Sequence, residues 1–277
     1  MLAETAYGKS SVRLVKVARH GDRHDLTDLT VAIRFEGDYD RSYTDGDNHD
    51  VLPTDTMKNT VYALAAEHAI AEPESFGVRL ARHFLERNPK LHRVTVDLSE
   101  HPWGRIPVGA HQHGQAFVHH GAECRTASVQ GGRDRMLVGA GVKGLVILKS
   151  SRSEFRDFRR DELTTLPDAS DRLLATALTA NWHYGASDID FNVAWRAVRS
   201  TMLETFAEHD SRSVQHTLYA MARAVLDSVE FITAVHLVMP NKHHLPVDLQ
   251  PLGLQNRNEI FVPTDEPYGL IEATVTR

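Results

Sequence analysis

The sequence predicts an α+β fold, with antiparallel sheets and paired helices on one face of each sheet. Three observations lead to this prediction. Strand-like segments alternate apolar and polar residues, helix-like segments repeat apolar residues at helical spacing, and the order strand pair, helix pair, strand pair occurs twice in 277 residues. The repeat predicts two tandem units, over residues 1–138 and 139–277.

The first repeat opens with a predicted hairpin. Residues 29–35 (LTVAIRF) alternate apolar and polar positions, and residues 11–17 (SVRLVKV) supply the partner strand across a polar turn. Two amphipathic helices follow, separated by the break AEPES, and their apolar faces consist of Met57, Val61, Leu64, Ala65, Phe76, Leu80 and Phe84. Residues 92–99 return to strand alternation, and residues 126–130 continue the sheet after a His- and Gly-rich loop.

The second repeat follows the same order. Residues 144–150 (GLVILKS) form a predicted strand, and a long polar stretch runs over 151–190. Two helices are expected next, with Ser211 as the cap of the second and with buried faces made by Ala194, Val198, Met202, Phe206, Val214, Leu218, Met221 and Val225. Three further strands are predicted over 230–238, 259–263 and 269–275.

Composition excludes several classes of protein. The 31 Lys and Arg residues against 37 Asp and Glu give a net charge of −6, so we expect no general attraction to nucleic acid or to an anionic membrane. Cys124 is the only cysteine, which excludes an intramolecular disulfide and a multi-cysteine zinc site. The sequence contains neither a membrane-spanning apolar run nor a signal-peptide pattern, and we expect a cytoplasmic protein.

Two short motifs resemble known sites but lack the required context. Gly139, Gly141 and Gly144 fit G-x-G-x-x-G, but a strand-like LVILK follows where dinucleotide binding needs a helix, so we interpret them as a turn between strands. His111 and His113 have the spacing of metal ligands on a strand. Their Gly-rich surroundings favour a solvated or site-lining loop, and we assign no metal.

One short polar segment stands at the end of a predicted strand. Asn241-Lys242-His243-His244 follows a strand and a proline, where side chains can project from a rigid sheet into a cleft. The tripeptide Thr54-Asp55-Thr56 stands where the first helix begins, and local pattern alone suggests a helix cap.

Many segments, in order along the chain, resemble the urate oxidase (uricase) family. They are YGKSSVRLVKV, YTDGDNHDVLPTDTMKNTVYALA, FGVRLARHFLE, LTTLPDASDRLLAT, SVQHTLYAMA, MPNKHHLPVDL and GLQNRNEIFVPTDEPYGLIEATV. The chain departs from the family pattern at Pro53 and in the longer HQHGQAF segment. The resemblance implies two tandem tunnelling-fold (T-fold) units per subunit, and a homotetrameric barrel with active sites at the subunit interfaces.

The resemblance also implies the site residues. Lys9 of Y-G-K, Thr54 of T-D and His243 of N-K-H match the catalytic proton relay, with Thr54 supplied by the neighbouring subunit. The residues that match the substrate contacts are Arg172 and Gln215, which grip the purine edge, Phe155, which stacks on it, Asn241, which positions oxygen or water with Thr54, and Asp55, Leu166 and Val214.

The implied reaction is the oxidation of urate by O2 and water to 5-hydroxyisourate and H2O2, without metal, flavin or other cofactor. Urate is a flat anion, and paired donors from Arg and Gln beside an aromatic face suit such a ligand. Two alternatives stay open. One is a zinc-dependent, pterin-type T-fold enzyme that uses His111 and His113, and the other is a catalytically silent purine-binding oligomer.

Overall fold

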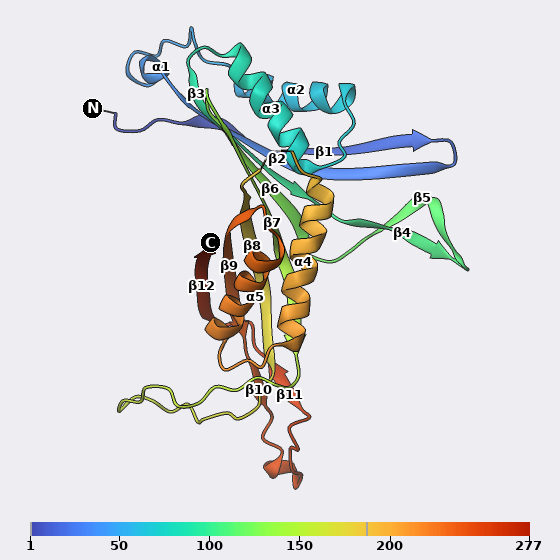
Figure 1. Cartoon of the computed structure of the whole chain (residues 1–277), viewed down its shortest axis with the longest axis vertical. Helices are drawn as coiled ribbons and strands as arrows, with labels where there is room; N and C mark the ends of the chain where they lie inside the picture. Colours follow the sequence, from blue (N-terminus) through green and yellow to red (C-terminus); the bar gives the residue numbers. More distant parts are fainter. Residues whose placement is uncertain (1, 187) are drawn as a thin grey trace. The chain divides into compact units, whose positions relative to one another are not determined.

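The structure is a computed structural model that describes residues 2–186 and 188–277. The chain divides into two compact units. Unit 1 comprises Met1–Gly141 and His183–Val193, and unit 2 comprises Val142–Trp182 and Ala194–Arg277. Figure 1 labels the helices and strands of both.

Unit 1 contains a curved sheet, two long helices and a separate hairpin. Its elements are β1 (Tyr7–His20), β2 (Arg23–Gly37), α1 (Asp40–Thr44), α2 (Thr54–Glu67), α3 (Pro73–Arg87), β3 (Leu91–Glu100), β4 (Trp103–Val108), β5 (His111–His119) and β6 (Cys124–Gly131). The strand β7 (Met136–Lys149) begins in unit 1 and continues into unit 2.

Unit 2 repeats this order of elements. Its elements are the second part of β7, then β8 (Leu174–Tyr184), α4 (Phe191–Glu208), α5 (Val214–Ser228), β9 (Ile232–Lys242), β10 (His244–Pro246), the 3-10 helix η1 (Gln250–Leu252), β11 (Phe261–Pro263) and β12 (Gly269–Thr276). The last residues of β8 and the first of α4 belong to unit 1.

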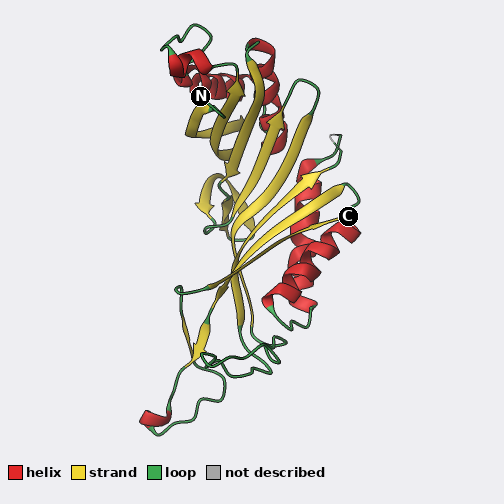
Figure 2. Ribbon diagram, turned by 90° about the vertical axis from the view of Figure 1, so that its left-hand side faces the viewer, coloured by secondary structure: helices red, strands yellow, loops and turns green. Residues whose placement is uncertain are grey.

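Each unit is built as two strands, two helices and two strands. In unit 1 the strands are hydrogen-bonded in the order β1-β2-β3-β6, all antiparallel, and in unit 2 the order is β7-β8-β9-β12. The paired helices cover one face of the strands in each unit (Figure 2). The predicted α+β class with antiparallel sheets is therefore confirmed. The predicted division after residue 138 falls inside β7 and stays a prediction.

Apolar periodicity identifies the core correctly. The β2 residues Leu29, Val31, Ile33 and Phe35 are all buried, as their alternation predicts. Every residue predicted on the apolar faces of the four long helices is also buried. These faces pack against the sheets, since a helix or sheet with one apolar face must cover it.

The glycine-rich segment is a strand and not a turn. Gly139 and Gly141 are buried inside β7, and Gly144, with a φ of 72°, lies in the same strand. The prediction of a turn is therefore wrong. Glycine residues occur in this buried strand because their small size lets the strand pack closely against its neighbours. A strand still follows the motif where a dinucleotide site needs a helix.

The His- and Gly-rich segment is a hairpin, β4–β5, where a loop was expected. Trp103 packs edge-on against His119 with ring centroids 5.2 Å apart. Arg105 Nη1 donates to the carbonyl oxygen of Gly114 over 2.6 Å. Glycine and histidine have a low preference for strands, so the composition of this segment does not predict a hairpin. The cross-strand contacts hold the hairpin together, and composition alone does not reveal them.

Two helix starts differ from expectation. Ser213, and not Ser211, caps α5, since its side chain accepts from the backbone N–H of His216 over 3.1 Å. At α2, no side chain caps the N-terminus, where Pro53 stands at the cap position. Thr54 is therefore the first helical residue and not a cap.

In each unit, a lysine on a strand donates hydrogen bonds to the C-terminal end of one helix. Lys16 Nζ on β1 donates to the carbonyl oxygen of His68, at the end of α2, over 2.7 Å. Lys149 Nζ on β7 donates to the carbonyl oxygens of Phe206 and His209, at the end of α4, over 3.2 and 2.5 Å. The last carbonyls of a helix lack intrahelical partners and carry partial negative charge, so each lysine stabilises its helix end.

A buried carboxylate makes the stability of unit 1 depend on pH. Glu74 on α3 is 0 % exposed and accepts from Arg125 Nη2 over 2.6 Å. Burial outweighs the attraction to Arg125 and raises the pKa of Glu74 to about 7. A raised pKa stabilises the fold below the unfolded value of 4.5, and this stability is lost as pH rises through about 7.

We therefore expect Glu74→Gln to flatten the pH dependence of unfolding. Between pH 4.5 and about 7 the wild type loses roughly 3 kcal/mol that the variant, with no titrating group, does not lose. Urea unfolding across this range measures the difference, with the exposed Glu86→Gln as the matched control. An unchanged pH slope in Glu74→Gln would contradict the assignment.

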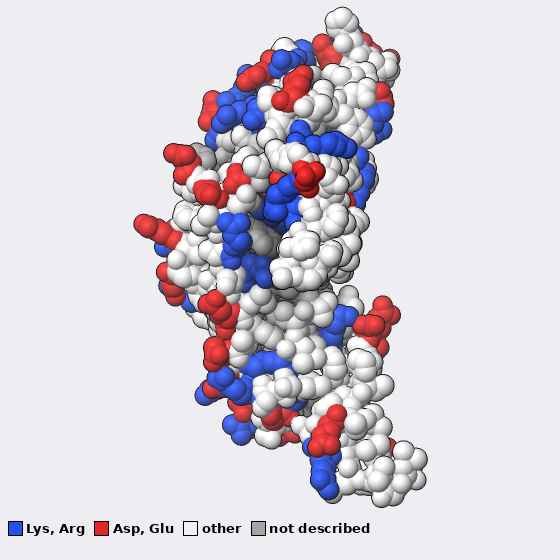
Figure 3. All heavy atoms as spheres, turned by 90° about the vertical axis from the view of Figure 1, so that its right-hand side faces the viewer, with Lys and Arg blue, Asp and Glu red and all other residues white. Residues whose placement is uncertain are grey.

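The surface carries mixed charge. Lys and Arg side chains lie among Asp and Glu side chains on the face drawn in Figure 3. Among residues 2–186 and 188–277, no helix combines the length and apolar character that crossing a membrane requires.

Candidate functional site

A cavity of about 300 Å³ in unit 2 brings together residues that are far apart in sequence. Its lining includes five of the predicted site residues, namely Phe155, Leu166, Arg172, Asn241 and His243. They come from the segment between β7 and β8 and from the end of β9. The resemblance had implied these residues one by one, and the fold places them on a single cavity.

Backbone hydrogen bonds around the buried Ser153 fix the first part of this wall. The Ser153 carbonyl oxygen accepts from Arg172 N over 2.7 Å, and Phe155 pairs with Ala169 through two hydrogen bonds of 2.8 and 2.9 Å. Asp171 Oδ1 accepts from Ser153 N over 3.1 Å. The aromatic ring and the guanidinium therefore project from two short chain segments that backbone hydrogen bonds hold together.

Arg172 is the least satisfied polar group of the cavity. Its Nε is buried and has no hydrogen-bond partner within the described residues. The guanidinium carbon lies 5.1 Å from the centroid of the Phe155 ring. Burial lowers the pKa of Arg172, and no acidic side chain offsets that cost. A buried donor without a partner is costly, so this one is directed at a ligand that supplies an acceptor.

The end of β9 supplies the opposite wall. Asn241 pairs with Gly269 of β12, and the carbonyl oxygen of His243 accepts from Thr264 N over 2.9 Å. Neither the amide of Asn241 nor the imidazole of His243 forms a hydrogen bond with another described residue. Both side chains line the cavity, so both can donate to or accept from a bound molecule.

Val214 and Gln215 occupy the first turn of α5, beside this wall and outside the cavity lining. Glu154 N donates to the Ser211 carbonyl oxygen over 2.8 Å, which ties the approach to α5 to the strand that carries Phe155. Val214 is buried, and Gln215 is exposed at the helix N-terminus. Free backbone N–H groups at such a terminus favour an anion.

Lys9, Thr54 and Asp55 belong to unit 1. Lys9 pairs with Ile33 directly before a β-bulge, in which Ser11 has a φ of 57°. A side chain at Gly8 would place its Cβ 1.9 Å from the Ile33 carbonyl oxygen, so only glycine fits there. A bulge re-aims the neighbouring side chains, and this one sets the direction of Lys9.

The start of α2 lies close to Lys9 in the same chain. Lys58, and to a smaller extent Lys9, lower the pKa of Asp55. The Tyr7 hydroxyl, on the strand of Lys9, accepts from Leu52 N over 3.1 Å, two residues before Thr54. The resemblance had implied that the neighbouring subunit supplies Thr54 to Lys9. Within this chain both residues lie in unit 1, where this hydrogen bond joins their segments, and the supply of Thr54 by a neighbouring subunit stays a prediction.

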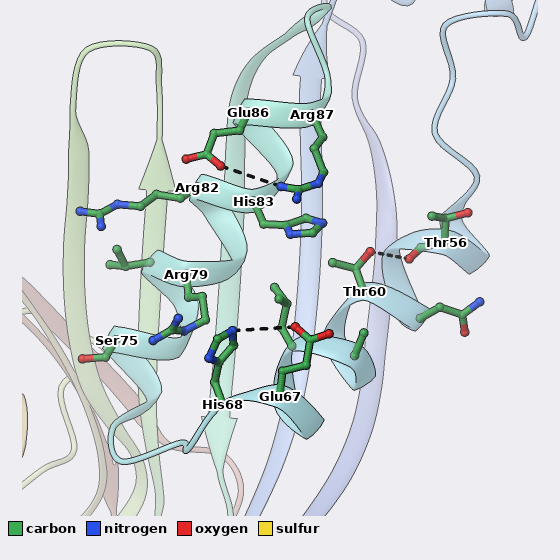
Figure 4. Close-up of a pocket in the computed structure, with 14 residues that line it drawn as sticks. Thr56, Thr60, Glu67, His68, Ser75, Arg79, Arg82, His83, Glu86 and Arg87 are labelled. Carbon is green, nitrogen blue, oxygen red and sulfur yellow. Dashed lines mark hydrogen bonds and ion pairs between the residues drawn. The ribbon is translucent and has the colours of Figure 1, made fainter.

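A larger cavity, about 730 Å³, lies between α2 and α3 (Figure 4). Basic and acidic side chains line it, with His68 3.9 Å from Glu67 and Arg87 3.8 Å from Glu86. None of the predicted site residues lines this cavity. Because the unit 2 cavity brings together five of the predicted site residues and this cavity none, we place the site in unit 2.

The predicted metal alternative finds little support in the arrangement of side chains. In the described part of the chain, no group of three or more His, Cys, Asp and Glu residues could hold a metal ion. His111 and His113 lie on β5, where His113 Nδ1 accepts from the backbone N–H groups of Gln115 and Ala116 over 3.0 Å each.

Some residues that line the cavity were not among the predicted site residues. His244 and Phe261 line the cavity beside His243, and Asp171 lines it while bracing Ser153. His244 stands in the same polar segment as His243 and could have been found there. Phe261 was assigned only to a strand, and nothing in the sequence indicated where that strand would lie.

The fold and the site define a class of protein: a T-fold protein of two tandem units, whose cavity suits a flat anion with acceptors on one edge. The chain belongs to the Uricase family, whose model matches residues 5–130 and 138–272. The predicted family and the assignment to the oxidoreductases are thereby confirmed.

Named relatives agree over the full length. The uricase of Arthrobacter globiformis is 42% identical over 100% of this chain and 90% of its own, and that of Danio rerio is 36% identical over 99% and 94%. The crystal structure of the Arthrobacter globiformis uricase superposes with a TM-score of 0.96, covering 100% of this chain and 95% of that one. A urate oxidase structure from Bacillus sp. TB-90, 25% identical, gives 0.86 and covers 99% of each.

Proposed function

We propose that this protein is a urate oxidase that converts urate, O2 and water into 5-hydroxyisourate and H2O2 without a metal or organic cofactor. The observation that carries the proposal is the buried Nε of Arg172, which has no partner among the described residues and lies beside Phe155 in a cavity of about 300 Å³. Urate offers that arginine a carbonyl edge and offers the ring a flat face. Family membership supports the same substrate.

The polar groups of the site divide into binding and proton-transfer roles. Arg172 and Gln215 hold the purine edge, Phe155 stacks on the ring, the Leu166 side chain closes an apolar side, and the backbones of Asp55 and Val214 supply the remaining contacts. A second deprotonation of urate gives a dianion that is electron-rich enough to reduce O2 directly. The proton passes from the substrate through the Thr54 hydroxyl to Lys9, His243 completes this relay, and Asn241 with Thr54 positions the oxygen or water.

Electrons and atoms balance without a further reactant. Two electrons leave the urate dianion and reduce O2 to peroxide, which departs as H2O2 once protons are returned. Water then adds at the oxidised carbon and supplies the hydroxyl of 5-hydroxyisourate. Lys9, Thr54 and His243 hold and return the protons at each step.

We further propose that the protein works as a homotetramer in the cytoplasm, with each site shared between copies. Unit 1 supplies Lys9, Thr54 and Asp55, and unit 2 supplies the remaining site residues. In a shared site, the first group comes from one copy and the second from its neighbour. Closed assemblies of this kind pair the free sheet edges of each copy.

Mixing two inactive variants tests whether sites are shared. Lys9→Met and Arg172→Ala subunits, unfolded together and refolded as a random mixture, regenerate about a quarter of the sites with both halves intact if each site joins two copies. Each variant refolded alone is the control. Activity that does not exceed that of the separate variants would show that a site uses one copy only.

One assay distinguishes the proposed reaction from both alternatives. Loss of urate absorbance is followed together with O2 consumption and H2O2 formation, in buffer stripped of metal. We expect the three rates to agree and chelators to have no effect. Turnover abolished by a chelator favours the zinc-dependent enzyme, and tight urate binding without O2 consumption identifies the silent purine-binding oligomer.

Tyr7→Phe tests how Lys9 and Thr54 are held together. The substitution removes the hydroxyl that accepts from Leu52 N, and leaves that N–H without its partner. We expect kcat to fall about fivefold, since a lost hydrogen bond of this kind is worth about 1 kcal/mol. Tyr43→Phe is the control, because its more exposed hydroxyl donates to Ala6 O over 3.0 Å. Equal effects of the two substitutions would contradict a positioning role for Tyr7.

A further inference from the structure

The segment between Phe155 and Ala169 contains a row of stacked side chains that reaches the cavity. The Phe155 and Phe158 rings stack with centroids 4.9 Å apart and planes inclined by 11°. The guanidinium carbon of Arg160 lies 4.6 Å from the Phe158 centroid, and that of Arg172 lies 5.1 Å from the Phe155 centroid. The order of the row is Arg160, Phe158, Phe155, Arg172, and we call it the ladder.

The outer end of the ladder is tied to the cavity wall. Arg160 Nη2 forms an ion pair with Asp168 Oδ1 over 3.0 Å, and its Nη1 donates to the Leu166 carbonyl oxygen over 3.1 Å. Asp168 Oδ1 also accepts from Asp157 N over 3.3 Å. Arg160 therefore joins both arms of the segment and fixes Leu166, whose side chain lines the cavity.

The tip of the segment is closed by its own hydrogen bonds. Asp161 Oδ1 accepts from Leu163 N over 3.0 Å and from the Thr164 hydroxyl over 2.8 Å. Asp157, with a φ of 58°, makes the turn that brings Phe158 under Phe155. The ladder and the Arg160 contacts add to these hydrogen bonds in ordering the segment.

Phe158 does not line the cavity, whereas Phe155 and Arg172 do. Phe158 thus stacks on the Phe155 ring from outside the cavity, while the guanidinium of Arg172, which lines the cavity, lies over the same ring. Ring pairs and cation–ring pairs each hold their members in preferred orientations.

We propose that Phe158 and Arg160 are positioning residues for the purine site. This inference rests on the proposed function, because it concerns the same cavity. Phe158 fixes the tilt of the Phe155 ring, and Arg160 fixes both Phe158 and the Leu166 wall. A substrate then meets a stacking surface and a gripping arginine that are already oriented, which reduces the cost of binding.

Phe158→Leu and Arg160→Gln test the ladder. Each is expected to raise the KM for urate about fivefold, with a much smaller change in kcat, because ground-state stacking is weakened while the proton relay is untouched. Phe158→Tyr keeps the aromatic face, and its KM should equal that of the wild type. Arg159→Gln removes the same charge one residue away, where no described contact is lost, and should leave the KM unchanged.

A second measurement separates this inference from the proposed reaction. Hydrogen exchange of the backbone amides of residues 156–168 should become faster in Arg160→Gln and remain at the wild-type rate in Arg159→Gln, whether or not urate is oxidised. If the wild-type protein does not oxidise urate, the proposed function is wrong, but the inference about the ladder is not affected. Unchanged exchange in Arg160→Gln, or KM values within about twofold of wild type in both Phe158→Leu and Arg160→Gln, would overturn the ladder.

Discussion

Replacing Lys9 with methionine is expected to lower kcat by about 10²–10⁴-fold and to leave the KM for urate much less changed. The site needs a base in the proposed proton relay, and methionine has nearly the same length as lysine without the amine. Gly8 and the bulge at Ser11 fix the backbone at this position against β2.

Steady-state kinetics with urate, in parallel with thermal unfolding, check this expectation. Lys90→Met is the matched control, because Lys90 is an exposed lysine of the same unit and lines none of the site. A Lys9→Met protein that folds normally and keeps more than about a tenth of the wild-type kcat would show that Lys9 is not the base.

Replacing Arg172 with alanine is expected to raise the KM for urate about a hundredfold. Two charge-assisted hydrogen bonds to the purine edge are lost, each worth roughly 1.5–3 kcal/mol, and part of this loss is offset by removal of a buried charge. The buried and unpartnered Nε indicates that the free protein already bears the cost of desolvating this group. A bound substrate supplies the missing acceptor.

Arg172→Lys is the informative companion, since it keeps the charge and loses the planar pair of donors. We expect its KM to lie between those of the wild type and of Arg172→Ala. Equilibrium binding of xanthine, a purine of similar shape, should weaken in the same order. If the lysine variant matched the wild type, charge alone would explain the grip and the bidentate contact would be wrong.

Regular periodicity made most of the fold predictable. The alternation in β2 and the helical spacing in α2, α3, α4 and α5 depend on apolar burial, which is local information. The strand β8 was missed, because residues 151–190 were interpreted as one long polar stretch. From Leu178 to Tyr184 buried residues alternate with more exposed ones, so this part of the strand could have been predicted by the same periodicity.

The periodicity of the sequence predicts the site less well than it predicts the fold. Nothing in the spacing of Phe155, Arg172 and His243 indicates that they meet, and the family resemblance was needed to name them. What joins Phe155 and Arg172 is the backbone network at Ser153, which no side-chain pattern reveals. The closeness of Lys9 to the start of α2 likewise depends on Tyr7, whose role cannot be seen in the Y-G-K motif alone.

The reactivity of the two lysines that bind the ends of α2 and α4 can be used to measure how each unit opens. Lys16 and Lys149 donate to helix-end carbonyls, so their amines are shielded from acylating reagents while those helix ends are intact. Timed labelling followed by mass spectrometry would therefore report local opening at one position per repeat. The labelling rates of Lys16 and Lys149, compared at increasing temperature, would show which unit of the duplicated fold opens first.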